Sequence, residues 1–263
     1  MVNEEAIKTI EKRRSYRTFD YNHPVEPEVE KRLMELTLRA PSAGNMQLYS
    51  VIRVTDPDKK AILARTCDNQ KFIEKAPLVW LFLADSGKWF DYFKLSESDR
   101  KFDIPVRKPG IGDFHLSMQD AMAAAETCVL AAESLGLKSC FIGDIIENFE
   151  EVRDTFNLPP FASPAALLVM GYPKEEIKAP YSERPNADAF FMENGYPEIT
   201  LEYLEKQYSN QEAFLRERKR LPLDNTGTIA DYYFQRKYTS TFMSEMNRSV
   251  KSFLAPWLEE DED

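Results

Sequence analysis

Residue types on which many catalytic sites depend are scarce in this chain. Its 263 residues include two histidines, His23 and His115, and three cysteines. The histidines form no HExxH pair, and Cys67, Cys128 and Cys140 are spaced neither for zinc nor as a CxxC pair. A metal enzyme is therefore disfavoured. The cysteines are expected to act as small apolar residues, and a reducing cytoplasm is the expected location.

Glycine is also scarce, with nine residues, and the motifs built on it are missing. Gly110-Ile111-Gly112 is followed by His115 where a dinucleotide-binding fingerprint needs a third glycine, and no strand is predicted before it. The chain has no GxxxxGK and no GxSxG. These absences argue against a Rossmann dinucleotide site, a P-loop and a serine hydrolase.

Net positive charge and long apolar runs are absent too. The formal charge is −10, from 34 Lys and Arg against 44 Asp and Glu, so we expect neither a general nucleic-acid partner nor an acidic membrane surface. No apolar run reaches the length of a membrane helix, and the first residues lack the apolar core of a signal peptide. A hydrophobic content of 43% nevertheless suits a globular protein with a sizeable core.

The most informative stretch runs from Ser117 to Asp144. Small or apolar residues recur there at three- and four-residue spacing, at Ala121, Ala124, Ala125, Cys128, Ala131, Ala132 and Leu135. This predicts a helix with Asp120 near its N-terminal end and Gly136 as a left-handed residue closing it. The helix is either simply a core helix or one that leads to a ligand-facing strand end, Phe141–Asp144. Because small residues cover so wide a face, a homodimer is expected to bury it.

Four segments are predicted as strands: Leu48–Thr55, Pro77–Ala84, Ser139–Ile142 and Pro164–Tyr172. Helical patterns occupy 3–13, Glu26–Ala40, 56–66, Asn69–Lys75, Glu147–Phe156, Glu198–Arg220 and Ile229–Leu258. Ser86–Phe114 reads as an irregular lid or interface segment. This alternation indicates one α+β or three-layer α/β domain over residues 1–263, with 198–263 as a helical C-terminal extension.

Two polar segments could carry chemistry. Arg13-Arg14-Ser15-Tyr16-Arg17 places three guanidiniums and hydroxyls just past a helix, a donor set that suits phosphate oxygens. The same cluster could instead be a solvated helix end. Ser42–Gln47 is a small polar loop immediately before a strand, and it is either a ligand loop or a plain connection.

Three motifs occur in a specific order: RRSxRxF near the N-terminus, APSxxNxQ before a strand, and AAESLGLxxxFIG after the long helix. Over about residues 5–185 this order resembles the FMN-dependent nitroreductase family, and the long C-terminal part is similar to its NADPH-preferring branch. The resemblance implies an α+β three-layer sandwich whose central, mostly antiparallel sheet is flanked by helices. It also implies a homodimer with FMN at the subunit interface.

The resemblance further implies which residues would bind FMN. The phosphate and ribityl chain would contact Arg13, Arg14, Ser15 and Arg17, while Ser42, Gln47 and Gln70 would contact the flavin. Phe141, Ile142 and Gly143 would line its ring, and either Lys178 or Arg184 would add a cation near the phosphate. Relatives tend to have a second glycine where this chain has Asp144. A backbone N–H at that position would still reach flavin N5, so Asp144 is also expected to contact the cofactor. Its carboxylate would, however, disfavour an anionic reduced flavin and lower the potential.

The activity implied is hydride transfer from NADPH or NADH through flavin N5 to nitro compounds, quinones or flavins, by a ping-pong mechanism with no catalytic side chain. Alternatives are a flavin-binding relative that fragments flavin or dehalogenates a substrate, and a non-enzymatic acidic interaction protein. A basic cluster, Arg216-Glu217-Arg218-Lys219-Arg220, is either a solvated helix face or, as in the resembling branch, a contact for the 2′-phosphate of NADPH.

Overall fold

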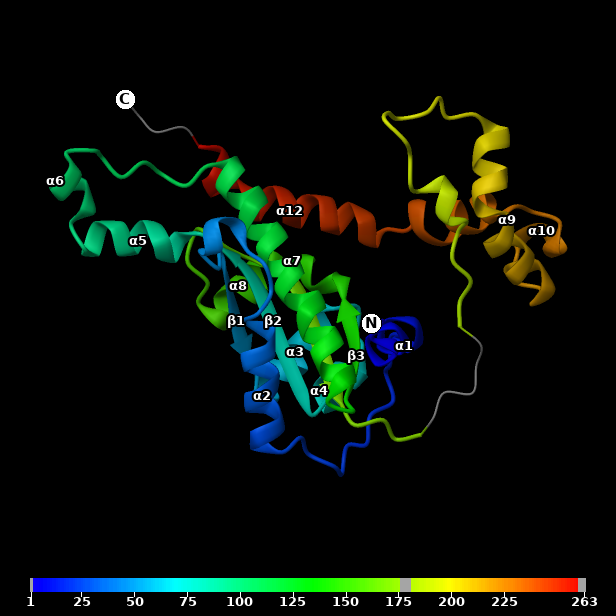
Figure 1. Cartoon of the computed structure of the whole chain (residues 1–263), viewed down its shortest axis with the longest axis horizontal. Helices are drawn as coiled ribbons and strands as arrows, with labels where there is room; N and C mark the ends of the chain where they lie inside the picture. The colour runs from blue at the N-terminus through cyan, green and yellow to red at the C-terminus, as the bar shows by residue number, and fades with distance from the viewer. Residues whose placement is uncertain (1, 176–180, 260–263) are drawn as a thin grey trace. The chain divides into compact units, whose positions relative to one another are not determined.

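The core of the protein is a four-stranded antiparallel sheet in the order β1-β2-β4-β3. The computed structural model describes residues 2–175 and 181–259. Its strands are β1 (Tyr49–Arg53), β2 (Leu78–Asp85), β3 (Lys138–Ile142) and β4 (Ala162–Gly171). All four predicted strands are therefore confirmed, as is the α+β class with an antiparallel central sheet (Figure 1).

The chain divides into two compact units, one formed by 2–175 with 245–259 and the other by 181–244 among the described residues. Helices of the first unit are α1 (Glu4–Lys12), α2 (Pro27–Thr37), α3 (Pro57–Thr66), α4 (Lys71–Lys75), α5 (Gly87–Leu95), α6 (Ser98–Phe102), α7 (Ile111–Ser134), α8 (Phe149–Phe156) and most of α12 (Phe242–Leu258). The predicted extension is thus shared between the units, and a single FMN-binding domain over 1–263 stays a prediction.

Side chains of β2 alternate between the two faces of the sheet, and all eight of its residues are buried. Trp80 and Phe82 enter the apolar core that the sheet forms with α2 and α7. Leu81 and Leu83 enter the opposite core, together with residues of α3, α4, α8 and α12. This produces the helix–sheet–helix layers, because a strand covered on both faces must be apolar at every position.

Helix α7 begins six residues earlier than expected, at Ile111, and Gly110 precedes it as the N-cap residue. Asp120 therefore lies inside the helix, not near its N-terminal end, and the prediction that it caps the helix was wrong. The expected end is confirmed. Gly136 has φ +80°, and the Leu137 amide bonds the Ala132 carbonyl at 2.9 Å, which closes the last turn.

The alanine-rich face of α7 is buried within one chain. Ala121, Ala124, Ala125 and Ala132 are 0% exposed and pack in the core with β2, β4 and α2. The inference of a homodimer from this face was therefore wrong: the small side chains allow the helix to approach its own sheet closely, as Figure 1 shows for α7 across the strands.

Ser86–Phe114 is more regular than expected, since it contains α5, α6 and the start of α7. Trp89, Phe90 and Phe93 have helical spacing, and the Trp89 and Phe93 ring centroids lie 5.7 Å apart. The many interspersed charges obscured this short aromatic face. Leu95 and Phe102 are 83% and 73% exposed, so the segment carries a large apolar surface.

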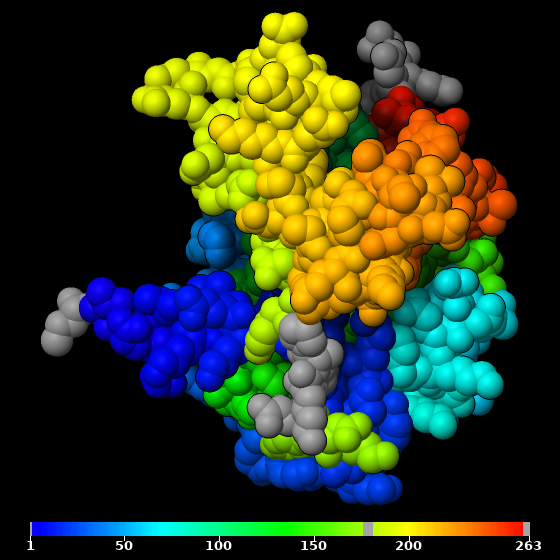
Figure 2. All heavy atoms as spheres, turned by 90° about the vertical axis from the view of Figure 1, so that its right-hand side faces the viewer, coloured from blue at the N-terminus to red at the C-terminus, as the bar shows by residue number. Residues whose placement is uncertain are grey.

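Helix α1 lies on the surface of the first unit with no buried residue. Figure 2 shows it in dark blue, standing out from the N-terminal part of the chain. Ile10, on its apolar stripe, is 62% exposed. The helix ends at Lys12, which places Arg13 and Arg14 in the segment that leaves it.

The second unit contains α9 (Leu201–Glu217), α10 (Pro222–Asn225), α11 (Ile229–Tyr233) and a π-helical turn, η4 (Phe234–Tyr238). Its small core joins Leu215, Leu221 and Ile229. The Glu212 carboxylate accepts from the Ile229 amide at 3.0 Å and pairs with Arg216 at 2.7 Å. Charged side chains of α9 therefore hold the following turns in place.

Candidate functional site

The segment after α1 is fastened to the sheet by its two aromatic residues. The Tyr16 amide donates to the Ser139 carbonyl at 2.8 Å, and its buried phenol donates to the Glu175 carbonyl at 2.6 Å. Phe19 is fully buried and bridges to Pro173. Tyr16, which we did not single out as an anchor, thus fixes the backbone from which the neighbouring arginines project.

Two of the three arginines remain available to a ligand. Arg13 is half-buried, Arg17 is exposed, and neither forms an ion pair with any residue in 2–175 or 181–259. The Arg17 guanidinium lies 5.9 Å from the centroid of the Phe72 ring. Two guanidiniums held near the sheet without an acid are a donor set that fits a phosphate group.

The environment of Cys140 in β3 shows that several predicted residues gather there. Burial raises the pKa of its thiol, whereas the nearby Arg17 and Arg13 charges and a hydrogen bond with Ser15 lower it. The negative charge of the Asp144 carboxylate raises the pKa of the same thiol. Arg13, Ser15, Arg17 and Asp144 therefore all lie near Cys140.

Gln70 joins this group through Asp144. The Gln70 side-chain nitrogen lies 2.5 Å from Asp144 Oδ2 and 3.0 Å from the Cys67 carbonyl. Gln70 precedes α4, while Asp144 lies in the 3₁₀ turn η2 (Gly143–Ile146) that follows β3. Two connections far apart in sequence thus meet at the end of the strand.

The three residues predicted to line the flavin ring, Phe141, Ile142 and Gly143, have different environments. Phe141 is half-buried and packs on the α7 side of the sheet. The Ile142 side chain is 2% exposed and belongs to the opposite core, so only its backbone can face a ligand. A Cβ at Gly143 would meet none of the described heavy atoms within 4 Å, which leaves that backbone open.

The Ser42–Gln47 loop is bound to α7 by hydrogen bonds. The Asp120 carboxylate accepts from the amides of Ala43 at 2.8 Å and Leu48 at 3.0 Å, at both ends of the loop. Ser42 Oγ accepts from the Gln47 amide at 3.1 Å and from its side chain at 3.0 Å. Sequence reasoning missed this role of Asp120, because a buried carboxylate inside a helix has no local signal.

The loop and the arginine segment do not meet within one chain. Ser42–Gln47 leads into β1, whereas Ser15 pairs with β3, and these are the two edge strands. Three strand spacings separate those edges, or about 14 Å. Lys178 lies outside the described residues, and Arg184 belongs to the second unit. The predicted residues therefore form two groups on opposite edges of the sheet.

Glu147, just past the turn that holds Asp144, is a buried acid with unusual surroundings. It is 7% exposed, and its Oε1 has no hydrogen-bond partner among the described residues. Burial, followed by the charges of Asp144, Asp68 and Glu245, raises its pKa from 4.5 to about 7. The carboxyl group is therefore largely protonated in the folded protein at mildly acidic pH.

This acid should make folding stability depend on pH. Between about pH 4.5 and 7 the folded chain binds more protons at Glu147 than the unfolded chain, so stability falls as pH rises through that window. Glu147→Gln should be about 1–3 kcal/mol more stable than the wild type at pH 8, and nearly equal to it at pH 5. Urea unfolding of both proteins at the two pH values measures this.

Glu151→Gln is the matched control, because that carboxylate pairs with Arg65 and its pKa is lowered. Its loss should destabilise the protein at pH 8. If Glu147→Gln had the same effect as this control, Glu147 would be ionised without penalty, contrary to the prediction.

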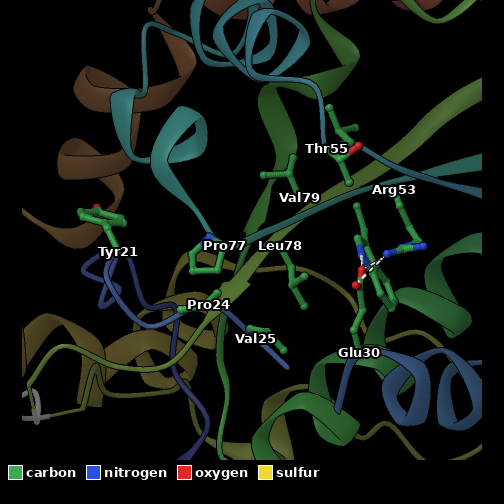
Figure 3. Close-up of a pocket in the computed structure, with 11 residues that line it drawn as sticks. Tyr21, Pro24, Val25, Glu30, Arg53, Thr55, Pro77, Leu78 and Val79 are labelled. Carbon is green, nitrogen blue, oxygen red and sulfur yellow. Dashed lines mark hydrogen bonds and ion pairs between the residues drawn. The ribbon is translucent and has the colours of Figure 1, made fainter. Parts of the chain in front are cut away.

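A separate cavity of about 240 Å³ lies among the ends of β1 and β2 and the turn before α2. Figure 3 shows Glu30 and Arg53 facing each other in its wall, and their two hydrogen bonds are both 2.7 Å long. The cavity contains none of the predicted flavin residues. Since its arginine is already neutralised by Glu30, we do not assign a phosphate ligand to it.

The described residues contain neither a metal-binding cluster nor a membrane-spanning helix. Within 2–175 and 181–259, no group of three or more His, Cys, Asp or Glu side chains is arranged to hold a metal ion. None of the helices in the same ranges is long and apolar enough to cross a membrane.

Comparison with known proteins gives one consistent family. Residues 10–172 match the nitroreductase family. An FMN reductase [NAD(P)H] from Bacillus subtilis is 32% identical over 172 residues, which is 65% of this chain and 67% of that protein. An NADPH-flavin oxidoreductase from Vibrio harveyi is 27% identical over 81% of this chain and 83% of its own length. The structure of nitroreductase A from Vibrio parahaemolyticus has the same fold, with a TM-score of 0.79, 21% identity, and coverage of 99% of this chain and all of that one.

Proposed function

The chain belongs to the nitroreductase family, and on that basis we propose that it is an FMN-dependent oxidoreductase that uses NADPH or NADH. The observation that carries the proposal is the pair of guanidiniums, Arg13 and Arg17, beside β3. They are held there by the buried Tyr16 and Phe19 and have no described acidic partner. A dianionic phosphate would supply the missing charge.

Bound FMN would supply two-electron chemistry, accepting hydride from a nicotinamide and passing it to an acceptor. The chain's own groups bind and orient it. Arg13, Arg17 and the Ser15 hydroxyl hold the phosphate end, and the open Gly143 backbone allows close approach to the ring. No catalytic side chain is assigned, which agrees with the scarcity of histidine, of which the sequence has only two.

We further propose that a second copy of the chain completes the site. The arginine segment and the Ser42–Gln47 loop lie on opposite edges of one sheet whose two faces are both covered by helices, so a ligand that contacts both groups would use two chains. A twofold dimer brings unlike edges of the two copies together at two equivalent sites. Exposed apolar residues of α1 and of α5–α6, among them Ile10, Leu95 and Phe102, offer the surface that such a dimer would bury.

The acceptors proposed are nitro compounds, quinones and free flavins, used in a ping-pong cycle in which nicotinamide and acceptor occupy the same place in turn. A cytoplasmic location also stays a prediction, and the three free, buried cysteines are compatible with it. Flavin fragmentation or dehalogenation remains the alternative that an acceptor screen would detect. An interaction protein without a cofactor is disfavoured by the family match.

The purified protein should carry FMN absorbance, and anaerobic NADPH should bleach it before any acceptor is added. Stopped-flow absorbance measures that step, and a nitroarene, a quinone or free FMN should then restore the oxidised spectrum. A protein that binds no FMN after supplementation would contradict the cofactor assignment. Bleaching that no acceptor reverses, with breakdown of the flavin itself, would favour fragmentation.

A further inference from the structure

The contact between Gln70 and Asp144 determines which way the Gln70 carboxamide points. A carboxylate only accepts hydrogen bonds, so the group 2.5 Å from Asp144 Oδ2 must be the NH₂ of Gln70 and not its oxygen. The second hydrogen of the same NH₂ is directed to the Cys67 carbonyl, 3.0 Å away. Both donors are used, and the carbonyl oxygen is left without a hydrogen-bond partner among residues 2–175 and 181–259.

The backbone around this contact is tightly constrained on both sides. Asp68 and Asn69, which precede Gln70, adopt left-handed conformations with φ of +58° and +54°. The Ile73 amide then bonds the Gln70 carbonyl at 3.0 Å. On the other side, the Glu147 amide bonds the Asp144 carbonyl at 3.0 Å within the turn after β3. A side chain held between two such turns has little freedom to flip its amide.

We propose that Asp144 is a positioning residue that fixes Gln70 with its carbonyl oxygen turned toward the flavin. The inference rests on the proposed function, because it takes Gln70 to contact FMN. A carbonyl oxygen can pair only with a donor, and the ring N–H of oxidised flavin is at N3. Gln70 then fixes the orientation of the ring through N3–H and gives no donor to N1 or O2.

This assignment differs from a simple effect of charge. A carboxylate acting by charge alone would have the same effect on FMN whether or not Gln70 is present. A carboxylate acting through Gln70 loses its effect when Gln70 is removed. The two possibilities therefore give different results in a double-mutant cycle.

The cycle compares FMN dissociation constants of the wild type, Asp144→Asn, Gln70→Ala and the double variant. Asp144→Asn should weaken FMN binding about 3- to 10-fold when Gln70 is present, and by less than about twofold when Gln70 is already replaced by alanine. Asp68→Asn is the matched control, because it removes another nearby carboxylate. Asp68 has no hydrogen bond with Gln70 in the described structure. Asparagine also tolerates the positive φ of this position. The effect of Asp68→Asn should be equal in both backgrounds.

A spectroscopic signature separates positioning from loss of packing. With ¹⁵N-labelled FMN bound, the N3–H resonance should move in Gln70→Ala and in Asp144→Asn but stay unchanged in Asp68→Asn. The same loss of affinity in both Gln70 backgrounds, or an N3–H resonance that Gln70→Ala leaves in place, would overturn the inference. A wild type that binds no FMN would instead contradict the proposed function itself.

Discussion

Replacing Arg13 and Arg17 together by alanine should weaken FMN binding at least about 100-fold. Each charge-assisted contact to a phosphate contributes about 1.5–3 kcal/mol, and the two guanidiniums lie on the same short segment beside β3. The fold should survive, because the segment is fastened by Tyr16 and Phe19 and does not depend on the arginines. Recovery of FMN fluorescence on dilution measures the dissociation constant.

A variant with the same change in charge controls for long-range electrostatics. Arg32 and Arg100 are both exposed. Arg32 pairs with Glu35 within α2, and Arg100 pairs with Glu97, the residue that precedes α6. Arg32→Ala/Arg100→Ala should retain FMN. If Arg13→Ala/Arg17→Ala kept its flavin through dialysis as well, the arginines would be a solvated helix end and the phosphate assignment would be wrong.

The variant Arg13→Ala/Arg17→Ala also tests whether two chains share the site. Ser42→Ala/Gln47→Ala removes polar groups on the opposite edge of the sheet, so its defect lies in the other proposed half of the site. Random exchange between the two defective proteins should restore one intact site in each mixed dimer, or about a quarter of the wild-type FMN content. No recovery, from proteins that light scattering shows to have exchanged, would contradict a shared site.

Removing the charges of Lys219 and Arg220 should lower kcat/KM for NADPH about 10- to 150-fold and leave that for NADH nearly unchanged. Within the predicted basic cluster, we expect these two residues to contact the nucleotide. Both are exposed and form no ion pair within residues 2–175 and 181–259. They can therefore contact the 2′-phosphate that distinguishes the two nucleotides.

The other two arginines of the cluster have structural contacts. Arg216 donates to the carbonyls of Asn225 at 2.6 Å and Gly227 at 3.1 Å, which holds the turn after α9. The Arg218 guanidinium lies 3.6 Å from the centroid of the Phe214 ring. Alanine at Arg216 should thus reduce stability without changing nucleotide preference.

Steady-state kinetics measures kcat/KM for NADPH and for NADH. The proteins compared are the wild type, Lys219→Ala/Arg220→Ala and Arg32→Ala/Arg100→Ala. The last variant should match the wild type. A wild type that prefers NADH, or an unchanged preference in Lys219→Ala/Arg220→Ala, would remove this cluster from cofactor choice.

Local sequence patterns predicted most elements of the fold, although not α5 and α6. The unbroken apolar run Pro77–Ala84 indicated a strand covered on both faces, and β2 is buried at every position. Gly136 marked the end of α7, because a left-handed residue is needed there. These predictions succeeded since each depends on a local pattern: strand burial, helix spacing or a backbone conformation that favours one residue type.

The order of the strands and the partners of the buried polar groups became evident only in the folded chain. Nothing near Asp120 in the sequence shows that it binds both ends of a loop more than 70 residues earlier. The alanines of α7 indicated close packing, but their spacing is the same whether a partner chain or the chain's own sheet lies opposite. Likewise Asp144 could be seen to replace a glycine, whereas its hydrogen bond to Gln70 requires two distant turns to meet. Hydrophobic periodicity encodes which face of an element is buried, and only the folded chain determines what that face meets.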